Sequence, residues 1–179
     1  MIGRNEVGYL SLGVSIAMIL ERRLQTSIAQ ISDGSKFSLE LDFALQPGRC
    51  SIFQGIHASQ IIDSSYNAAP TSMLHMIKTT IQLRQELFPE YQLRYCLGDM
   101  RELGEFTERE HRNLAAIVAQ SADKVYLVGE HMRSFLYDEL LKLGFSQQKI
   151  QGFPSSKELG RQLALDLEQA STPALCLFK

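Results

Sequence analysis

The stretch IIDSSYNAAPTSM, residues 61–73, decides the fold because it joins two kinds of element within a few residues. Two apolar residues run into Asp63, two serines, Tyr66 and Asn67, and Pro70 follows shortly afterwards. Proline suits the first turn of a helix, where its missing N–H costs no hydrogen bond. The stretch therefore predicts a buried strand that ends near Asp63 and a helix that begins at Pro70.

The same change from strand to helix recurs along most of the remaining chain. Short apolar runs alternate with amphipathic stretches of helical period. The predicted strands are residues 50–53, 60–63, 92–97, 124–128, 149–153 and 174–178. Thr107-x-x-Glu110 and Ser155-x-x-Glu158 read as capping boxes at helix starts, and Gly144 reads as a helix end. This alternation favours an α/β fold, a Rossmann-like three-layer domain with a mostly parallel sheet and helices on both faces.

Residues 1–45 do not follow this rhythm. A helical pattern covers residues 6–24, and a stretch containing Ser, Gly and Asp follows it. We interpret residues 1–45 as a helical remnant of a neighbouring domain and residues 46–179 as the main domain. The apolar run at 7–20 is shorter than the ~20 residues that a membrane-spanning helix needs. We therefore expect no membrane insertion and a cytoplasmic location.

Composition and residue spacing indicate neither disorder, nor nucleic-acid binding, nor a metal site. Hydrophobic residues make up 45% of the chain and the net charge is -2, so neither disorder nor a nucleic-acid footprint is indicated. Cys50, Cys96 and Cys176 lie in apolar runs without CxxC spacing, which favours buried reduced thiols. His111 has no second His or Cys at ligand spacing, so we expect it to pack in or on a helix rather than bind metal.

Polar residues gather where two of the predicted strands end, after residues 60–63 and 92–97. Ligands of open α/β sheets bind outside the carboxyl ends of the strands, so residues 63–67 and the loop at 98–104 are candidates. A local explanation competes with this one, because Asp, Ser and Asn side chains often bond nearby N–H groups. For Asp99 the competing explanation is a solvated turn with an ion pair. The residue types leave both possibilities open, and no phosphate loop, dinucleotide fingerprint or hydrolase elbow is present.

Two motifs together resemble the carboxyl-terminal domain of the Mur ligase family: YNAxPxS at 66–72 and LGDMxELG at 97–104. The resemblance extends over nearly all of residues 46–179, and the tyrosine-asparagine form is similar to the type that adds D-alanyl-D-alanine to a UDP-muramoyl tripeptide. It implies ATP-dependent amide ligation in peptidoglycan precursor synthesis, with Mg²⁺ and an acyl phosphate. The family's phosphate loop lies in a central domain, to which residues 1–45 would belong. The resemblance also implies that the last helix is missing and that the chain alone is inactive.

The resemblance also implies residue roles. The nucleotide contacts would come from Arg49, Asp63, Ser64, Tyr66 and Asn67. The residues near the incoming dipeptide would be Asp99, Met100 and Glu102. Ser64 stands where the family often has a second acid, so a neutral hydrogen bond would replace a charged one. No catalytic residue and no metal ligand is assigned to this chain. The alternative is a stand-alone nucleotide-binding or regulatory module that kept the fold without ligase activity.

Overall fold

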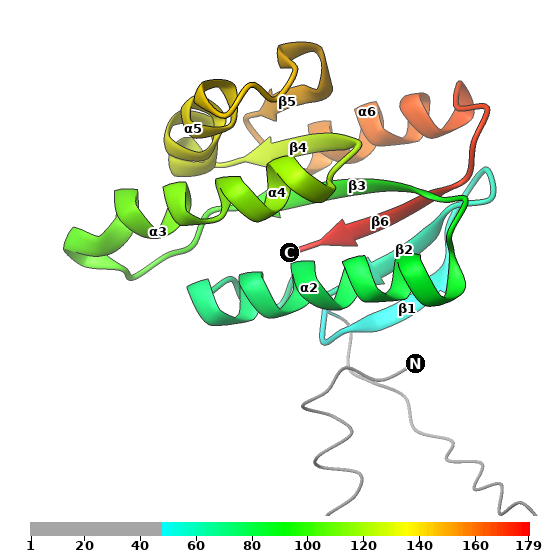
Figure 1. The fold of residues 1–179 in the computed structure, drawn as a ribbon, viewed down its shortest axis with the longest axis horizontal. Coiled ribbons are helices and arrows are strands. Elements are labelled where there is room, and N and C mark those ends of the chain that lie inside the picture. Colours follow the sequence, from blue (N-terminus) through cyan, green and yellow to red (C-terminus); the bar gives the residue numbers. More distant parts are fainter. Residues whose placement is uncertain (1–47) are drawn as a thin grey trace, which may run out of the picture. The chain divides into compact units, whose positions relative to one another are not determined.

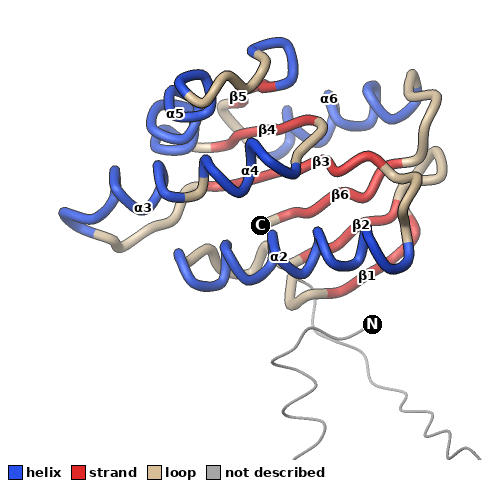
Figure 2. The backbone as a smooth tube through the Cα atoms, in the orientation of Figure 1, coloured by secondary structure: helices blue, strands red, loops and turns tan. Residues whose placement is uncertain are grey.

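The structure is a computed structural model that describes residues 48–179 (Figures 1 and 2). The predicted helix at 6–24 and the assignment of residues 1–45 to a neighbouring domain lie outside the described residues.

The described residues contain one six-stranded sheet with the strand order β1-β2-β6-β3-β4-β5. The strands are β1 (Ser51–Gln54), β2 (Gln60–Asp63), β3 (Gln92–Gly98), β4 (Lys124–Val128), β5 (Ile150–Phe153) and β6 (Ala174–Phe178). Strand β1 runs antiparallel to β2, and the other neighbouring pairs are parallel. The predicted α/β fold with a mostly parallel sheet is confirmed.

Helices connect most of these strands. The α-helices are α2 (Pro70–Leu87), α3 (Thr107–Asn113), α4 (Ala115–Ser121), α5 (Tyr137–Lys142) and α6 (Ser156–Glu168). Shorter helical turns are η2 (Gly104–Phe106), η3 (Met132–Leu136) and η4 (Gln147–Lys149). Within residues 48–179, no helix combines the length and the apolar character that crossing a membrane requires.

The strand order explains why helices cover both faces of the sheet. From β2 to β5 the chain moves in one direction along the sheet, and it then turns back to insert β6 between β2 and β3. Because crossovers between parallel strands are right-handed, this reversal puts α6 on the face opposite α2 and α4. Figure 1 shows α2 and α4 in front of the sheet and α6 behind it. The three predicted layers are therefore present.

The strands feed both core layers with alternate residues. On one face, the apolar stripe of α6 packs against strand side chains from β3, β4 and β6; the stripe is Leu159, Leu163 and Leu167, and the strand residues are Cys96, Tyr126, Ala174 and Cys176. The strand residues between these point to the other face, and Leu93, Tyr95, Leu127, Leu175 and Leu177 among them are 0% exposed. The central strands are thus buried on both faces, as is usual for a parallel sheet.

Helix starts test the sequence signals. Pro70 is the first residue of α2, as predicted. Of the capping box predicted at Ser155, the half that involves the Ser155 side chain is present, since its hydroxyl accepts a hydrogen bond from the Glu158 N–H at 3.3 Å. The predicted capping box at Thr107 is wrong. Helical turn η2 leads directly into α3, and the Thr107 hydroxyl donates to the Gly104 carbonyl at 2.7 Å instead.

Candidate functional site

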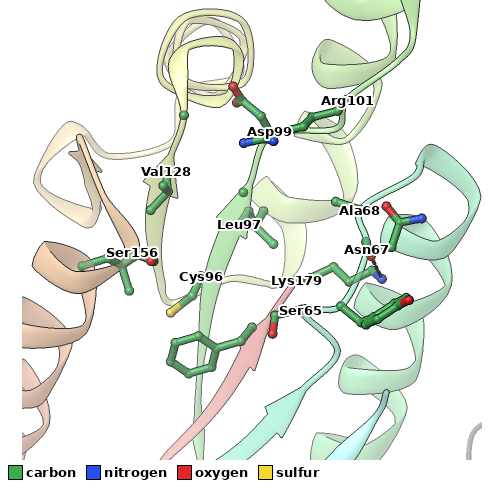
Figure 3. A pocket seen from close by; sticks show the side chains of 15 residues that line it. Ser65, Asn67, Ala68, Cys96, Leu97, Asp99, Arg101, Val128, Ser156 and Lys179 are labelled. Atoms are coloured by element: carbon green, nitrogen blue, oxygen red, sulfur yellow. Dashed lines mark hydrogen bonds between the residues drawn. The ribbon is translucent and has the colours of Figure 1, made fainter. Parts of the chain in front are cut away.

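A pocket of about 500 Å³ opens at the carboxyl ends of β2, β6, β3 and β4 (Figure 3). It lies where the strand order reverses, around the end of β6, which is where open α/β sheets bind ligands. Its wall is formed by the turn after β2, the loops after β3 and β4, the first turn of α6 and the end of β6. The polar residues among those that line it are Ser65, Tyr66, Asn67, Asp99, Arg101, Ser156 and Lys179.

Asp63 ends β2 and organises the turn that follows it. One carboxylate oxygen accepts hydrogen bonds from the Ser65 N–H at 3.1 Å and the Ser65 hydroxyl at 2.6 Å. The other oxygen accepts from the Gly48 N–H at 3.1 Å. One oxygen therefore bonds within the turn, which is the local role that the residue types left open for Asp63, and the other ties the turn to the chain before β1.

Gly48, Arg49 and Tyr66 join the chain before β1 to the same turn. The Tyr66 N–H donates to the Gly48 carbonyl at 3.1 Å. Gly48 has φ +79°, and a Cβ there would lie 2.8 Å from the Tyr66 nitrogen, so this approach requires glycine. The Arg49 guanidinium lies over the Tyr66 ring, 4.1 Å from its centroid, while Tyr66 is 67% exposed. Arg49 and Tyr66 thus form an exposed cation–π pair.

Lys179 lies beneath the turn. Its backbone extends the pairing of β6 with β3, because its N–H donates to the Cys96 carbonyl and its own carbonyl accepts from the Gly98 N–H. Its side chain reaches the other neighbour, where Nζ donates to the carbonyls of Ser64 at 3.1 Å and Asn67 at 2.5 Å. The residue is 9% exposed, and burial lowers the pKa of the Lys179 ammonium. A buried cation therefore supports the turn from below.

Asp99 joins the loop after β3 to the segment after β4, on the side of the pocket opposite the turn after β2. Its carboxylate accepts hydrogen bonds from the N–H groups of Met132 at 2.7 Å and His131 at 3.2 Å, at the start of the helical segment after β4. Gly129 has φ +101°, and a Cβ there would lie 2.2 Å from the Asp99 side chain. Asp99 lines the pocket, as expected for its position, and its carboxylate also caps this helical segment.

His111 supports the Asp99 loop from the protein interior. Its Nε2 accepts a hydrogen bond from the Met100 N–H at 3.1 Å, and Nδ1 lies 2.7 Å from the Thr107 carbonyl. Because a carbonyl can only accept, the proton is on Nδ1 and the ring is neutral. Burial lowers the pKa of His111, which favours the same state. His111 is therefore a buried packing residue.

The resemblance implies that Met100 and Glu102 lie near the incoming dipeptide, but neither residue lines the pocket. Met100 is 1% exposed, and Glu102 is exposed. Between Gly48 and Lys179, no group of three or more His, Cys, Asp or Glu side chains could hold a metal ion.

The structure brings Tyr66, Asn67 and Asp99 to one pocket. Asp63 and Ser64 lie at the start of the turn after β2, and Arg49 contacts that turn through the Tyr66 ring, but none of the three lines the pocket; Ser64 is only 7% exposed.

Sequence reasoning missed one pocket cation, Lys179, and assigned no role to Arg101, which lies in the candidate loop at 98–104. Lys179 directly follows the last predicted strand, so the strand-end rule that selected Asp63 and Asp99 could have found it. Asp99 is the acidic side chain among the lining residues, and it already accepts two N–H groups, so with Arg101 and Lys179 beside it the pocket favours an anionic ligand.

Known proteins resemble this chain in sequence and in fold. Residues 48–176 match the family described as "Mur ligase, glutamate ligase domain". The UDP-N-acetylmuramoyl-tripeptide--D-alanyl-D-alanine ligase of Bacillus subtilis (strain 168) is 34% identical over 120 residues, which cover 66% of this chain and 24% of that enzyme. The chain thus spans about a quarter of the length of this curated relative.

Two solved structures share the fold. MurF from Acinetobacter baumannii is 25% identical with a TM-score of 0.59, over 87% of this chain and 31% of that one. MurF ligase from Thermotoga maritima in complex with ADP is 19% identical with a TM-score of 0.54, over 93% and 33%. Because the family match covers residues 48–176, the chain belongs to the Mur ligase family, and its described residues form a MurF-like domain of that family.

Proposed function

We propose that residues 46–179 are the carboxyl-terminal domain of an ATP-dependent amide-bond ligase that adds D-alanyl-D-alanine to a UDP-muramoyl tripeptide during peptidoglycan precursor synthesis. The observation that carries this proposal is the 34% identity to the Bacillus subtilis enzyme with that name. The motifs YNAxPxS and LGDMxELG support it, because they form two walls of one pocket at the carboxyl ends of the strands.

The turn after β2 would meet the nucleotide. Tyr66 is 67% exposed, so its ring offers an aromatic surface on which a base can stack. The Arg49 guanidinium already lies over this ring. Asn67 is exposed beside it and lines the pocket. We assign direct contact to these residues, whereas Asp63 and Ser64 shape the turn beneath them.

The charge of the pocket fits the phosphates of ATP. Arg101 and Lys179 are cations in its wall, and the Asp99 carboxylate is compensated by the N–H groups of His131 and Met132. When bound, ATP would supply the phosphoryl group that activates the muramoyl carboxylate as an acyl phosphate, leaving ADP, and the amine of the dipeptide would then displace phosphate to form the amide. The residues described here would bind and orient the nucleotide, and we assign Mg²⁺ to none of them.

The chain alone is not expected to catalyse the ligation. Phosphoryl transfer requires cations and donors positioned around the transferring group, and we assign those to a central domain outside residues 46–179. This domain would close over the nucleotide and complete the site.

A domain exchange tests the proposal. Residues 46–179 would replace the matching part of the Bacillus subtilis enzyme, and amide formation would be measured with UDP-muramoyl tripeptide, D-alanyl-D-alanine and ATP. We expect product from the chimera and none from the 179-residue chain. A folded chimera that binds ATP but forms no amide, or turnover by the chain alone, would contradict the proposal.

A second function is a nucleotide-binding or regulatory module without ligase activity. One observation favours it: every residue that lines the pocket lies between Ser65 and Lys179, so the pocket forms without another domain. Calorimetry on the 179-residue chain separates the two functions. Micromolar ATP binding by the chain, together with an inactive chimera, would support the module, whereas weak binding and an active chimera support the ligase domain.

A further inference from the structure

We propose that Lys179 is a positioning residue that holds the turn at residues 64–67 in the conformation that meets the nucleotide. The inference rests on the proposed function for the role of the turn, but the contacts of Lys179 are independent of it. In Figure 3 the Lys179 side chain extends from the end of β6 toward Asn67 at the pocket.

Lys179 binds both ends of the turn. Its Nζ donates to the carbonyls of Ser64 and Asn67, which bracket Ser65 and Tyr66. A single ammonium therefore fixes the separation of the two carbonyls, and with it the course of the chain between them.

The other hydrogen bonds of the turn hold residues that precede Asn67. The Asp63 carboxylate holds Ser65, and the Gly48 carbonyl holds the Tyr66 N–H. The Ser64 N–H donates to the Phe178 carbonyl at 2.9 Å, so the end of β2 remains fixed without Lys179. The loss of Nζ should therefore release Asn67, which lines the pocket and is the end of the turn that leads toward α2.

The choice of a lysine points to the site rather than to stability. Burying an ammonium is costly, because its charge loses water, and a neutral donor could bridge two carbonyls at lower cost. Lys179 is 9% exposed, yet it lies in the pocket wall with Arg101. An ammonium has three donors, and the two carbonyls use two of them. The charge thus orders the turn and makes the floor of the pocket positive toward a phosphate.

The test compares variants of the 179-residue chain. Lys179→Met keeps an unbranched side chain of nearly the same length and removes the donors, whereas Lys179→Arg keeps the charge and the donors. Lys149→Met removes one exposed lysine at the end of η4 and serves as the matched control. Two quantities are measured by NMR: the backbone amide signals of residues 66–69 without nucleotide, and the Kd for ATP from a titration that extends to millimolar concentrations.

We expect Lys179→Met to shift the amide signals of residues 66–69 and to weaken ATP binding by roughly tenfold. Lys179→Arg should recover most of the affinity, and Lys149→Met should leave both quantities unchanged. Unaltered amide signals in Lys179→Met would overturn the inference, as would equal ATP affinity. If Lys179→Met does not fold, Lys179→Leu, which also lacks a donor, takes its place, with the same expectations.

The two proposals fail in distinguishable ways. If the wild-type chain binds no ATP, the assignment of the nucleotide to this pocket fails, while the nucleotide-free signals of residues 66–69 still decide whether Lys179 positions the turn. If the wild-type chain binds ATP and Lys179→Met binds equally well, the role of Lys179 fails and the nucleotide assignment stands.

Discussion

The Asp99 carboxylate lies 2.7 Å from the backbone nitrogen of Met132, and this hydrogen bond ties the loop after β3 to the helical segment after β4. The two loops follow neighbouring parallel strands, in which Gly98 pairs with Val128. A carboxylate at the start of a helix is favoured, because it accepts from N–H groups that have no partner within the helix. The aspartate of the LGDMxELG motif is thus a structural cap as well as part of the pocket wall.

Replacing Asp99 by alanine should destabilise the fold by about 1–3 kcal/mol, since two N–H groups lose their acceptor. Urea unfolding followed by circular dichroism measures this difference. Glu90→Ala, at an exposed position before β3, is the control and should change stability by less than about 0.5 kcal/mol. Equal stabilities of the two variants would show that the cap contributes nothing.

Two glycines should respond to alanine with opposite signs. At Gly129 the φ of +101° is unfavourable for alanine, and the new Cβ would lie 2.2 Å from the Asp99 side chain, so a loss of about 1–3 kcal/mol is expected. At Gly160, inside α6, no atom beyond the adjoining helix backbone and the two neighbouring residues lies within 4 Å of the new Cβ, so helix propensity should add roughly 0.5–1 kcal/mol. Thermal unfolding of both variants measures the signs, and a stabilised Gly129→Ala would contradict the structure of this loop.

The sequence predicted the strands well because the signals are local. The apolar runs predict β2, β4 and β6 with the bounds that the structure has, and Pro70 predicts the start of α2. The strand-end rule also placed Asp63 and Asp99 at one edge of the sheet.

What the sequence could not show depends on distant pairing. Lys179 and Ser64 are 115 residues apart along the chain, and they meet only because β6 inserts between β2 and β3. The partners of Asp99 depend in the same way on the neighbouring loop, 32 and 33 residues along the chain. The Thr107 signal misled because a capping box and a helical turn that continues into the helix look alike in sequence.

Tyr66 should matter for nucleotide binding and little for stability. Because the residue is 67% exposed, Tyr66→Ala should unfold at nearly the wild-type temperature. Loss of a stacked base typically costs about 1–3 kcal/mol, so ATP should bind roughly 5- to 150-fold more weakly. Tyr66→Phe keeps the ring and should bind ATP like the wild type. If Tyr66→Ala binds ATP as the wild type does, the base does not stack on this residue.

The buried His111 should make the fold sensitive to mild acid. Its Nε2 accepts from the Met100 N–H, so protonation would break that bond and place a charge in the interior. Burial lowers the pKa of His111 in the folded chain, whereas the unfolded chain titrates near pH ~6.5. Below that pH the unfolded chain binds a proton that the folded chain does not, and this difference favours unfolding. The stability that neutral His111 contributes is therefore complete above pH ~6.5 and is lost as the pH falls toward its lowered folded value.

The measurement is the free energy of unfolding between pH 7.5 and pH 5 for the wild type and for His111→Gln. We expect the variant to be less stable at pH 7.5, because the bond from Met100 is altered, and to lose less stability as the pH falls. His75→Gln, on α2, controls for the removal of one histidine. If both variants change the pH dependence equally, the acid sensitivity does not come from His111. If His111→Gln keeps the full wild-type slope, the buried neutral ring is not the group that couples the Asp99 loop to pH.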